Sequence, residues 1–158
     1  MAFKFTVRQA LASDAQAMLP LTDAYFKGSG ARLAEEISFS RDCTYWLAEK
    51  DGKILGCLRA RALGAGAVRL IGAEWIALSD LRESGFDAAQ VLRILLRRSL
   101  GDMPALACFS PRTGFARQIG EALDALGFSL CAGASFPPRC ENEKRGMGEE
   151  ECMEIRIR

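Results

Sequence analysis

The segment from Ala73 to Leu100 constrains the fold more than any other part of the sequence. It begins as an extended apolar run, passes through a loop that contains Gly85, and continues as a helix from Ala88 to Leu100. The helix is indicated by apolar residues at helical spacing, namely Val91, Leu92, Leu95 and Leu96. Gly101 follows directly and predicts the end of the helix. A strand, a loop and a helix in this order are typical of an α/β protein.

The size and charge of the chain limit what it can do. Its 158 residues fit one domain spanning 1–158, and a chain of this length can bury a core without disulfides. With 21 basic and 20 acidic residues the net charge is +1, so we expect no nucleic-acid partner. No apolar stretch approaches the ~20 residues of a membrane helix, and the N-terminus lacks a signal-peptide pattern. We therefore expect a cytoplasmic protein with no membrane partner.

The cysteine and histidine content limits the chemistry. The six cysteines form no C-x-x-C pair and the sequence has no histidine, so we expect no metal site. Four cysteines lie in apolar contexts that favour buried, unreactive thiols, namely Cys43, Cys57, Cys108 and Cys131. The lack of histidine excludes Ser-His-Asp and Cys-His catalysis. Acid–base chemistry has to come from carboxylate, tyrosine, cysteine or lysine side chains, or from water.

The other elements follow from apolar periodicity and turn residues. A capping box at Ser13–Gln16 predicts the start of a helix that extends to Lys27, and Pro20 predicts a kink or a split in it. Asp51-Gly52 predicts a hairpin turn, and the extended run 67–79 is expected to bend at Gly72. Strands are expected at 3–9, 44–49, 53–63, 67–79, 105–110, 128–136 and 152–157, and further helices at 31–39, 88–100 and 115–126.

Four segments in this order resemble the GNAT superfamily of N-acetyltransferases. They are Phe5–Ala10 with Ser13-Asp14, Leu47–Gly56, Ala77–Asp87 and Leu123–Phe128, and the resemblance covers almost the whole chain. It implies an α/β (α+β) fold, with a mixed, mostly antiparallel central sheet flanked by about four helices. It also implies an acetyl-coenzyme A-dependent N-acyltransferase that acts on a small-molecule or peptide amine by direct transfer.

The loop that ends at Asp87 has a physical reason to bind an anion. Where a strand runs through a glycine-containing loop into a helix, backbone N–H groups and the positive end of the helix dipole meet at one point. In the GNAT superfamily this loop reads Q/R-x-x-G-x-G/A and holds acetyl-coenzyme A, and Arg82 and Gly85 match it. The residues expected to bind the cofactor are Ala77, Leu78, Ser79, Arg82, Ser84, Gly85, Phe86 and Asp87.

Asp87 and Leu123 depart from the family pattern. Asp87 puts a carboxylate where the family has Gly or Ala, and its charge opposes a phosphate unless Arg82 or Arg117 offsets it. Alternatively, Asp87 or Ser84 caps the helix and satisfies its N–H groups internally. Leu123 stands where many members carry the tyrosine that protonates the departing thiolate.

The catalytic candidates lie mostly on the strand before the loop. Glu74 is the candidate base, directly or through water, and the alternative is an outward-facing residue on a half-exposed strand. The backbone N–H groups of Ala77 and Leu78 are candidates for stabilising an oxyanion. Other candidates for the cleft are Cys108, Ser110 and Tyr25, with a core position as the alternative for Cys108 and Tyr25.

Two other function classes stay open beside the transferase. One is a GNAT-like module that binds or regulates without transferring an acyl group, for which Asp87 and Leu123 are the reasons. The other is a homodimer whose sheet edge or helix face is the functional surface, for which the apolar last two strands are the reason. The architecture favours the transferase.

Overall fold

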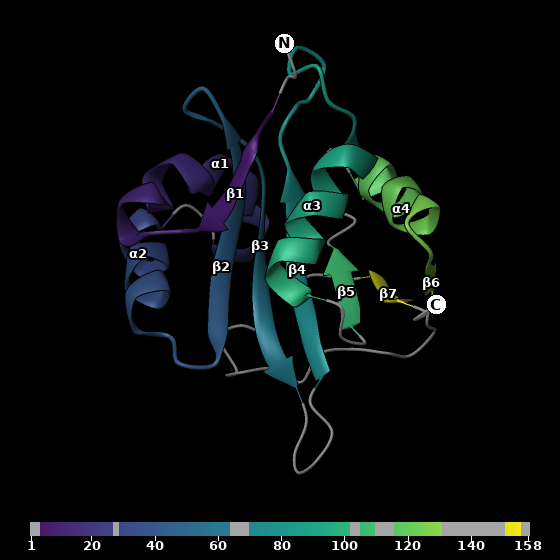
Figure 1. Ribbon diagram of the computed structural model, residues 1–158. Helices are drawn as coiled ribbons and strands as arrows, with labels where there is room; N and C mark the ends of the chain where they lie inside the picture. The colour runs from purple at the N-terminus through teal and green to yellow at the C-terminus, as the bar shows by residue number, and fades with distance from the viewer. Residues whose placement is uncertain are drawn as a thin grey trace.

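The centre of the molecule is a seven-stranded, mostly antiparallel sheet (Figure 1). A computed structural model describes residues 4–26, 29–63, 70–101, 105–109, 116–130 and 151–155. Within these residues the strand order is β1-β2-β3-β4-β5-β7-β6, and only β4 and β5 pair in parallel. The strands are β1 (Thr6–Gln9), β2 (Cys43–Lys50), β3 (Lys53–Leu63), β4 (Leu70–Leu78), β5 (Ala105–Phe109), β6 (Phe128–Leu130) and β7 (Glu151–Ile155).

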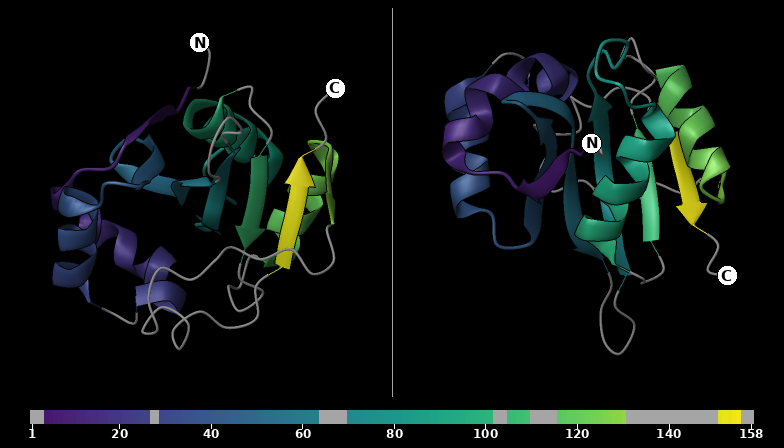
Figure 2. Two further views of the ribbon diagram at one scale, coloured as in Figure 1. Left: turned by 90° about the horizontal axis from the view of Figure 1, so that it is seen from below. Right: turned by 45° about the horizontal axis from the view of Figure 1, so that its top comes forward.

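Helices cover both faces of the sheet, as the left view of Figure 2 shows. The short 3-10 helix η1 (Ala12–Asp14) leads into α1 (Ala15–Phe26), which lies with α2 (Gly30–Phe39) on one face. On the other face lie α3 (Ala88–Leu100) and α4 (Ala116–Ala125). The order of elements is the predicted one, and the predicted fold class is confirmed.

Alternation along β3 decides which side chains face which helices. Leu58 and Ala60 belong to the core under α3 and α4, whereas Cys57 belongs to the core under α1 and α2. Because side chains two apart share a face, Arg59 and Arg61 point toward α1 and α2 with Cys57. Both arginines are buried.

The predicted hairpin between β2 and β3 is confirmed. Asp51 and Gly52 have φ of 51° and 78°, and two successive positive φ angles are the mark of a type I′ turn. This turn brings the start of β3 to the end of the sheet at which β4 finishes, because Gly56 of β3 pairs with Leu78 of β4. The hairpin therefore borders the loop that precedes α3.

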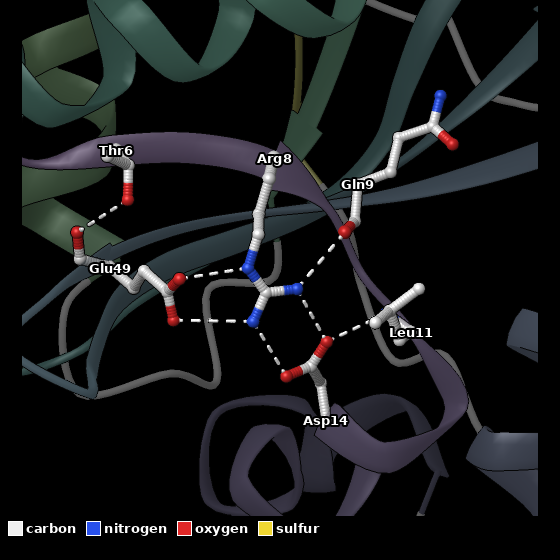
Figure 3. Close-up of polar contacts among 6 residues, drawn as sticks. All are labelled: Thr6, Arg8, Gln9, Leu11, Asp14 and Glu49. Carbon is white, nitrogen blue, oxygen red and sulfur yellow. Dashed lines mark hydrogen bonds and ion pairs between the residues drawn. The ribbon is translucent and has the colours of Figure 1, made fainter.

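One guanidinium joins the N-terminal strand to the rest of the fold (Figure 3). The Arg8 side chain of β1 donates to both carboxylate oxygens of Asp14 at 2.8 and 2.9 Å, and its Nε donates to Glu49 of β2 at 2.9 Å. The Asp14 carboxylate also accepts from the Leu11 N–H at 2.7 Å. Hydrogen bonding to Arg8 lowers the pKa of Asp14 and raises that of Arg8.

The capping box predicted at Ser13 is wrong, and so is the predicted alternative of a split at Pro20. The carboxylate of Asp14, rather than a capping box at Ser13, satisfies the backbone at this end, because Arg8 holds Asp14 against the Leu11 N–H. Helix α1 also continues through Pro20 without a split. Met18 and Thr22 on either side are fully buried, and this packing outweighs the cost of a proline inside a helix.

Two further expectations concern the whole chain. None of the described helices has the length and apolar content needed to cross a bilayer. In the same part of the chain, no group of three or more Cys, Asp or Glu side chains could hold a metal ion. Cys43 and Cys57 are buried, as predicted, whereas the side chains of Cys108 and Cys131 lie outside the described residues.

Candidate functional site

Strand β4 separates from β5 part-way along its length. The parallel ladder between them ends with the pair of Ala73 and Ala107. Beyond this pair, β4 continues to Leu78 against β3, while Cys108 and Phe109 of β5 pair with β7. Among the described residues, β4 therefore has an unpaired edge on its β5 side from Glu74 onward.

A β-bulge lies at the point of separation. Arg59 and Ala60 are consecutive on β3, but their partners on β4 are Trp75 and Ala73, so Glu74 is the extra residue. The bend predicted at Gly72 is wrong in position, since Gly72 pairs regularly with Arg61. A bulge re-aims a side chain, and here it turns Glu74 to the same face as Trp75.

Glu74 is part of a buried ionic cluster beneath α2. Its Oε2 lies 2.7 Å from Arg59 Nε, and its Oε1 lies 3.4 Å from Arg61 Nη1. The Cys43 thiol donates to Oε2 at 3.9 Å, and Arg59 Nη1 lies 3.9 Å from Glu36 of α2. The outward-facing alternative for Glu74 is therefore wrong, because the residue is 1% exposed. Its role as a base stays a prediction.

Tyr45 and Cys57, on the same face as this cluster, stay neutral at physiological pH. Burial raises the pKa of the Tyr45 hydroxyl, which accepts from Arg59 Nη1 at 3.5 Å, and raises the pKa of the Cys57 thiol to about 12. Trp75 packs against Tyr45 with ring centroids 6.0 Å apart. Neither the Cys57 thiol nor the Tyr45 phenol is therefore ionised for nucleophilic chemistry at neutral pH.

The register separates the two candidate oxyanion donors. The Ser79 N–H donates to the Leu55 carbonyl of β3 at 2.9 Å. Because N–H directions alternate along a strand, the Ala77 N–H also points to β3 and the Leu78 N–H points to the β5 side. Only the Leu78 donor faces the unpaired edge.

Ser84 and Gly85 shape the loop between β4 and α3. Gly85 has φ of 84°, a conformation that glycine adopts without strain. The Ser84 hydroxyl donates to the Leu81 carbonyl at 2.7 Å and accepts from the Phe86 N–H at 3.0 Å. Lys50 of β2 donates to the Ser84 carbonyl at 2.9 Å and lies over the Phe86 ring. Contacts within the loop and contacts from Lys50 of β2 thus both fix the loop conformation.

Asp87 caps α3. Its carboxylate accepts from the Gln90 N–H at 2.8 Å, and the Gln90 side chain accepts from the Asp87 N–H at 2.9 Å. This is a reciprocal capping box, as in the alternative interpretation of Asp87. The helix N-terminus therefore already carries one carboxylate of its own.

The charges around the loop are paired among themselves. Arg82 is exposed and donates to Asp80, and this contact lowers the pKa of Asp80 to about 2. Arg117 pairs with Glu121 at 3.1 Å. The two arginines expected to offset Asp87 thus contact other carboxylates.

An open cavity of about 760 Å³ lies between the β2–β3 turn and this loop. Three basic and three acidic side chains line it, namely Lys50, Lys53, Arg82, Asp51, Asp80 and Glu83. Because the charges balance, the cavity has no net field that would select an anion.

No protein-family model and no curated protein matches the sequence, but solved structures match the fold. A ribosomal-protein-alanine N-acetyltransferase from Brucella melitensis biovar Abortus 2308 is 15% identical, with a TM-score of 0.59, over 85% of this chain and 99% of that one. A GNAT-family acetyltransferase from Streptococcus pneumoniae is 14% identical, with a TM-score of 0.56, over 96% and 98%. The aminoglycoside N-acetyltransferase AAC(6')-Iy in complex with coenzyme A is 16% identical, with a TM-score of 0.56, over 89% and 98%.

The chain has the GNAT fold. The resemblance predicted from four short segments is confirmed at this level. The loop and helix α3, which the sequence placed after the strand that begins near Ala73, lie at the predicted positions.

The other candidates of the sequence do not gather at this site. Ser110 and the side chains of Cys108 and Tyr25 lie outside the described residues. Leu123 is fully buried in the core under α3 and α4. At the position expected for a proton-donating tyrosine, this GNAT fold therefore carries a core leucine.

Sequence reasoning missed the residues that hold the candidates in place. Arg59 and Arg61 pair with Glu74, and Gln90 completes the cap with Asp87. A signal for the arginines was available, because both lie in the otherwise apolar run from Ile54 to Leu63, and a buried arginine needs an acidic partner. Gln90 could have been found by the capping-box spacing from Asp87.

Proposed function

We propose that the chain is an acetyl-coenzyme A-dependent N-acyltransferase that transfers the acetyl group directly to an amine. The observation that carries the proposal is the unpaired edge of β4 beyond Ala73, which leads into the Gly85 loop and the start of α3. An extended thioester ligand can lie along such an edge while its phosphates meet the loop. The three GNAT-fold structures above are acetyltransferases by name, which supports the same chemistry here.

The start of α3 offers donors that fit a pyrophosphate. Ala88 and Ala89 are the first helical residues, and a helix has no internal acceptor for its first N–H groups. A Cβ placed on Gly85 would meet no atom within 4 Å, so there is open space over the loop. Arg82 is exposed and lines the cavity beside this loop, where a phosphate has to share its guanidinium with Asp80.

Two other amides of the loop fit less well. The Phe86 N–H donates to Ser84 Oγ, and the Asp87 N–H donates to Gln90 Oε1. A phosphate has to compete with these side chains, and the Asp87 carboxylate opposes its charge. We therefore expect weak binding of the cofactor, governed by Ala88, Ala89 and Arg82.

Bound acetyl-coenzyme A supplies an activated acyl group. In direct transfer the amine nitrogen bonds to the acyl carbon and the carbon–sulfur bond breaks, so that coenzyme A leaves as a thiolate. The proton that the amine loses passes through water to this thiolate and gives the free thiol. The Leu78 N–H, which points to the unpaired edge, is the donor that would stabilise the oxyanion. The acceptor belongs to the small-molecule or peptide amines, which is supported by neighbours named as a ribosomal-protein-alanine and an aminoglycoside N-acetyltransferase.

Calorimetric titration with acetyl-coenzyme A tests the proposal. We expect saturable binding at submillimolar to millimolar concentration, and release of free thiol when a suitable amine from a panel is added. Arg82→Ala should weaken binding about threefold to tenfold through the loss of one exposed charge. Arg93→Ala, an exposed arginine on the side of α3, is the matched control and should leave binding unchanged. No heat and no thermal shift at millimolar ligand would exclude the proposal.

A binding module without transfer is the second candidate, and the capping box of Asp87 and Gln90 favours it. In this case the loop amides serve the fold rather than a ligand. This candidate predicts that Asp87→Gly gains affinity for coenzyme A over the native chain, because a carboxylate and a competitor are removed. Tight binding by the native chain would rule it out.

A further inference from the structure

We propose that Glu74 is a positioning residue: its ion pairs with Arg59 and Arg61 hold the β4 bulge in place and so keep the edge of β4 free of β5. The inference rests on the proposed function, since it assigns a role within the same site. It differs from the role of a base, in which Glu74 would take a proton from the amine.

The positions of the two arginines carry the inference. Arg59 pairs with Trp75, on the C-terminal side of the bulge, and Arg61 pairs with Gly72, on its N-terminal side. Glu74 is the extra residue between them, and each of its carboxylate oxygens lies against one guanidinium, at 2.7 and 3.4 Å. The carboxylate thus bridges the regular ladder on both sides of the irregularity.

Burial makes this bridge hard to replace. The side chains of Glu74 and Arg59 are 2% exposed and that of Arg61 is 6% exposed. Water therefore cannot take over the contact, and loss of the Glu74 carboxylate would leave less negative charge beside two buried guanidinium groups. The strand would relieve this most readily by removing the bulge, which shifts the register of β4 beyond Ala73.

The same contacts argue against a role as base. Both carboxylate oxygens already lie against guanidinium groups, and the Cys43 thiol also donates to Oε2. The residue is 1% exposed under α2, so a substrate amine does not reach it. A base has to lie within hydrogen-bond distance of the proton that it removes, or one water away.

The bulge also marks where β4 becomes unpaired. Pairing with β5 stops at Ala73, and Glu74 is the next residue. The Leu78 N–H keeps its direction toward β5 only while the bulge is present, since loss of one residue from the register reverses every later N–H and side chain. Glu74 thereby decides which donors face the ligand.

Hydrogen exchange of the β4 amides tests the inference without any ligand. In the native chain the Ala77 amide, which points to β3, should exchange slowly, and the Ile76 and Leu78 amides should exchange fast. In Glu74→Gln we expect this order to reverse, or all three amides to exchange at least about tenfold faster. Glu49→Gln is the matched control, because Glu49 of β2 is a half-buried carboxylate that pairs with Arg8 of β1 and not with an arginine of β3. It should leave β4 exchange unchanged.

Binding and rate measurements separate positioning from base catalysis. Glu74→Gln and Arg61→Ala should both weaken acetyl-coenzyme A binding by about tenfold, the effect of ~1.4 kcal/mol. Any remaining transfer should keep the pH profile of the native chain. If Glu74→Gln instead binds normally, exchanges normally and loses the acidic limb of that profile, Glu74 is a base and the inference is wrong.

Two further comparisons keep the test decisive. If Glu74→Gln does not fold, Arg61→Lys replaces it, since it keeps the charge but shortens the reach to Glu74, and it should alter β4 exchange in the same direction. Native exchange in both Glu74→Gln and Arg61→Lys would overturn the inference. If the native chain binds no acetyl-coenzyme A while the exchange changes appear, the proposed function fails and the role of Glu74 in the bulge stands.

Discussion

At the scale of single residues, charged side chains fix the positions of neighbouring segments relative to one another. Arg8 fixes the edge strand to the first helical turn and to β2, and Glu74 joins two arginines across the bulge of β4. Both arrangements join segments that are distant in sequence through a few charge-assisted hydrogen bonds. The Arg8 contacts are half-exposed, so water screens them more than it screens the fully buried cluster.

Asp14 should make the protein sensitive to acid. Its pKa in the folded state lies below the ordinary value of 3.8, mainly because Arg8 donates to it. The stabilisation is therefore present above pH 3.8 and is lost as the pH falls through the folded pKa. Asp14→Asn should cost about 1 kcal/mol at pH 7 and reduce the loss of stability on acidification.

Urea unfolding between pH 7 and pH 3 measures this effect. The control is Asp124→Asn, an exposed carboxylate on α4. An Asp14→Asn variant with the native slope against pH would contradict the assignment.

At the scale of elements, close packing between strands sets the shape of the site. Gly56 of β3 lies directly opposite Leu78. Leu78 is the last residue of β4, and its N–H faces the unpaired edge. A Cβ at Gly56 would lie 2.8 Å from Leu78 Cδ2 and 3.1 Å from the Ala77 carbonyl oxygen. The end of β4 can therefore pack this closely against β3 because Gly56 has no side chain.

Gly56→Ala should destabilise the protein by about 1–3 kcal/mol, because the new methyl group has to displace Leu78 or the β4 backbone. Gly30→Ala at the start of α2 is the matched control. Its added Cβ meets the flexible end of Gln16, and alanine favours a helix, so its stability should change little or rise slightly. Equal losses of stability in the two variants would contradict the packing argument.

The elements differ in how well the sequence predicts them. Helix α3 and the β2–β3 hairpin are predicted nearly to the residue, because their signals are local: apolar spacing, a terminal glycine and an Asp-Gly turn. The bulge at Glu74 is not predicted, since it depends on how β4 aligns with β3 and leaves no local pattern. The partners of Glu74 come from other strands for the same reason.

The sequence likewise predicts some parts of the candidate site and not others. The loop residues were located because a strand, a glycine and a helix adjoin in sequence, and the cap at Asp87 was one of two alternatives that local chemistry allowed. The direction of the Leu78 N–H and the burial of Glu74 depend on register and on α2. Neither can be inferred from residue spacing within β4 alone.

At the scale of the whole molecule, the titratable groups predict a broad pH range of constant stability. The sequence has no histidine, so no side chain with an ordinary pKa changes charge between pH 5 and 8. Above that range buried acids matter. The pKa of Cys57 is about 12 in the folded state against 9.0 without the fold, and burial also raises the pKa of Tyr45.

Alkaline pH should therefore unfold the protein progressively. A group whose pKa is raised by folding stabilises the protein below its unfolded pKa, and the stabilisation is lost as the pH rises toward the folded value. From pH 9 upward, Cys57 should contribute a loss of about 1.4 kcal/mol per pH unit. Denaturant unfolding at pH 7, 9 and 10.5 measures it. Cys57→Ala should unfold with a smaller slope above pH 9, and an unchanged slope would refute the assignment.

The short ladder between β4 and β5 has a mechanical consequence. It is the only strand pairing between a hairpin-built half, β1 to β4, and a second half, β5 with β7 and β6, among the described strands. The two halves are otherwise joined by α4, which packs on α3 in the shared core. A ligand that enters between β4 and β5 therefore lies between two halves of the sheet that are joined by this one short ladder. Part of the binding free energy would be used to perturb the packing of α4 on α3. Occupancy of the site is thereby coupled to the rigidity of the C-terminal half.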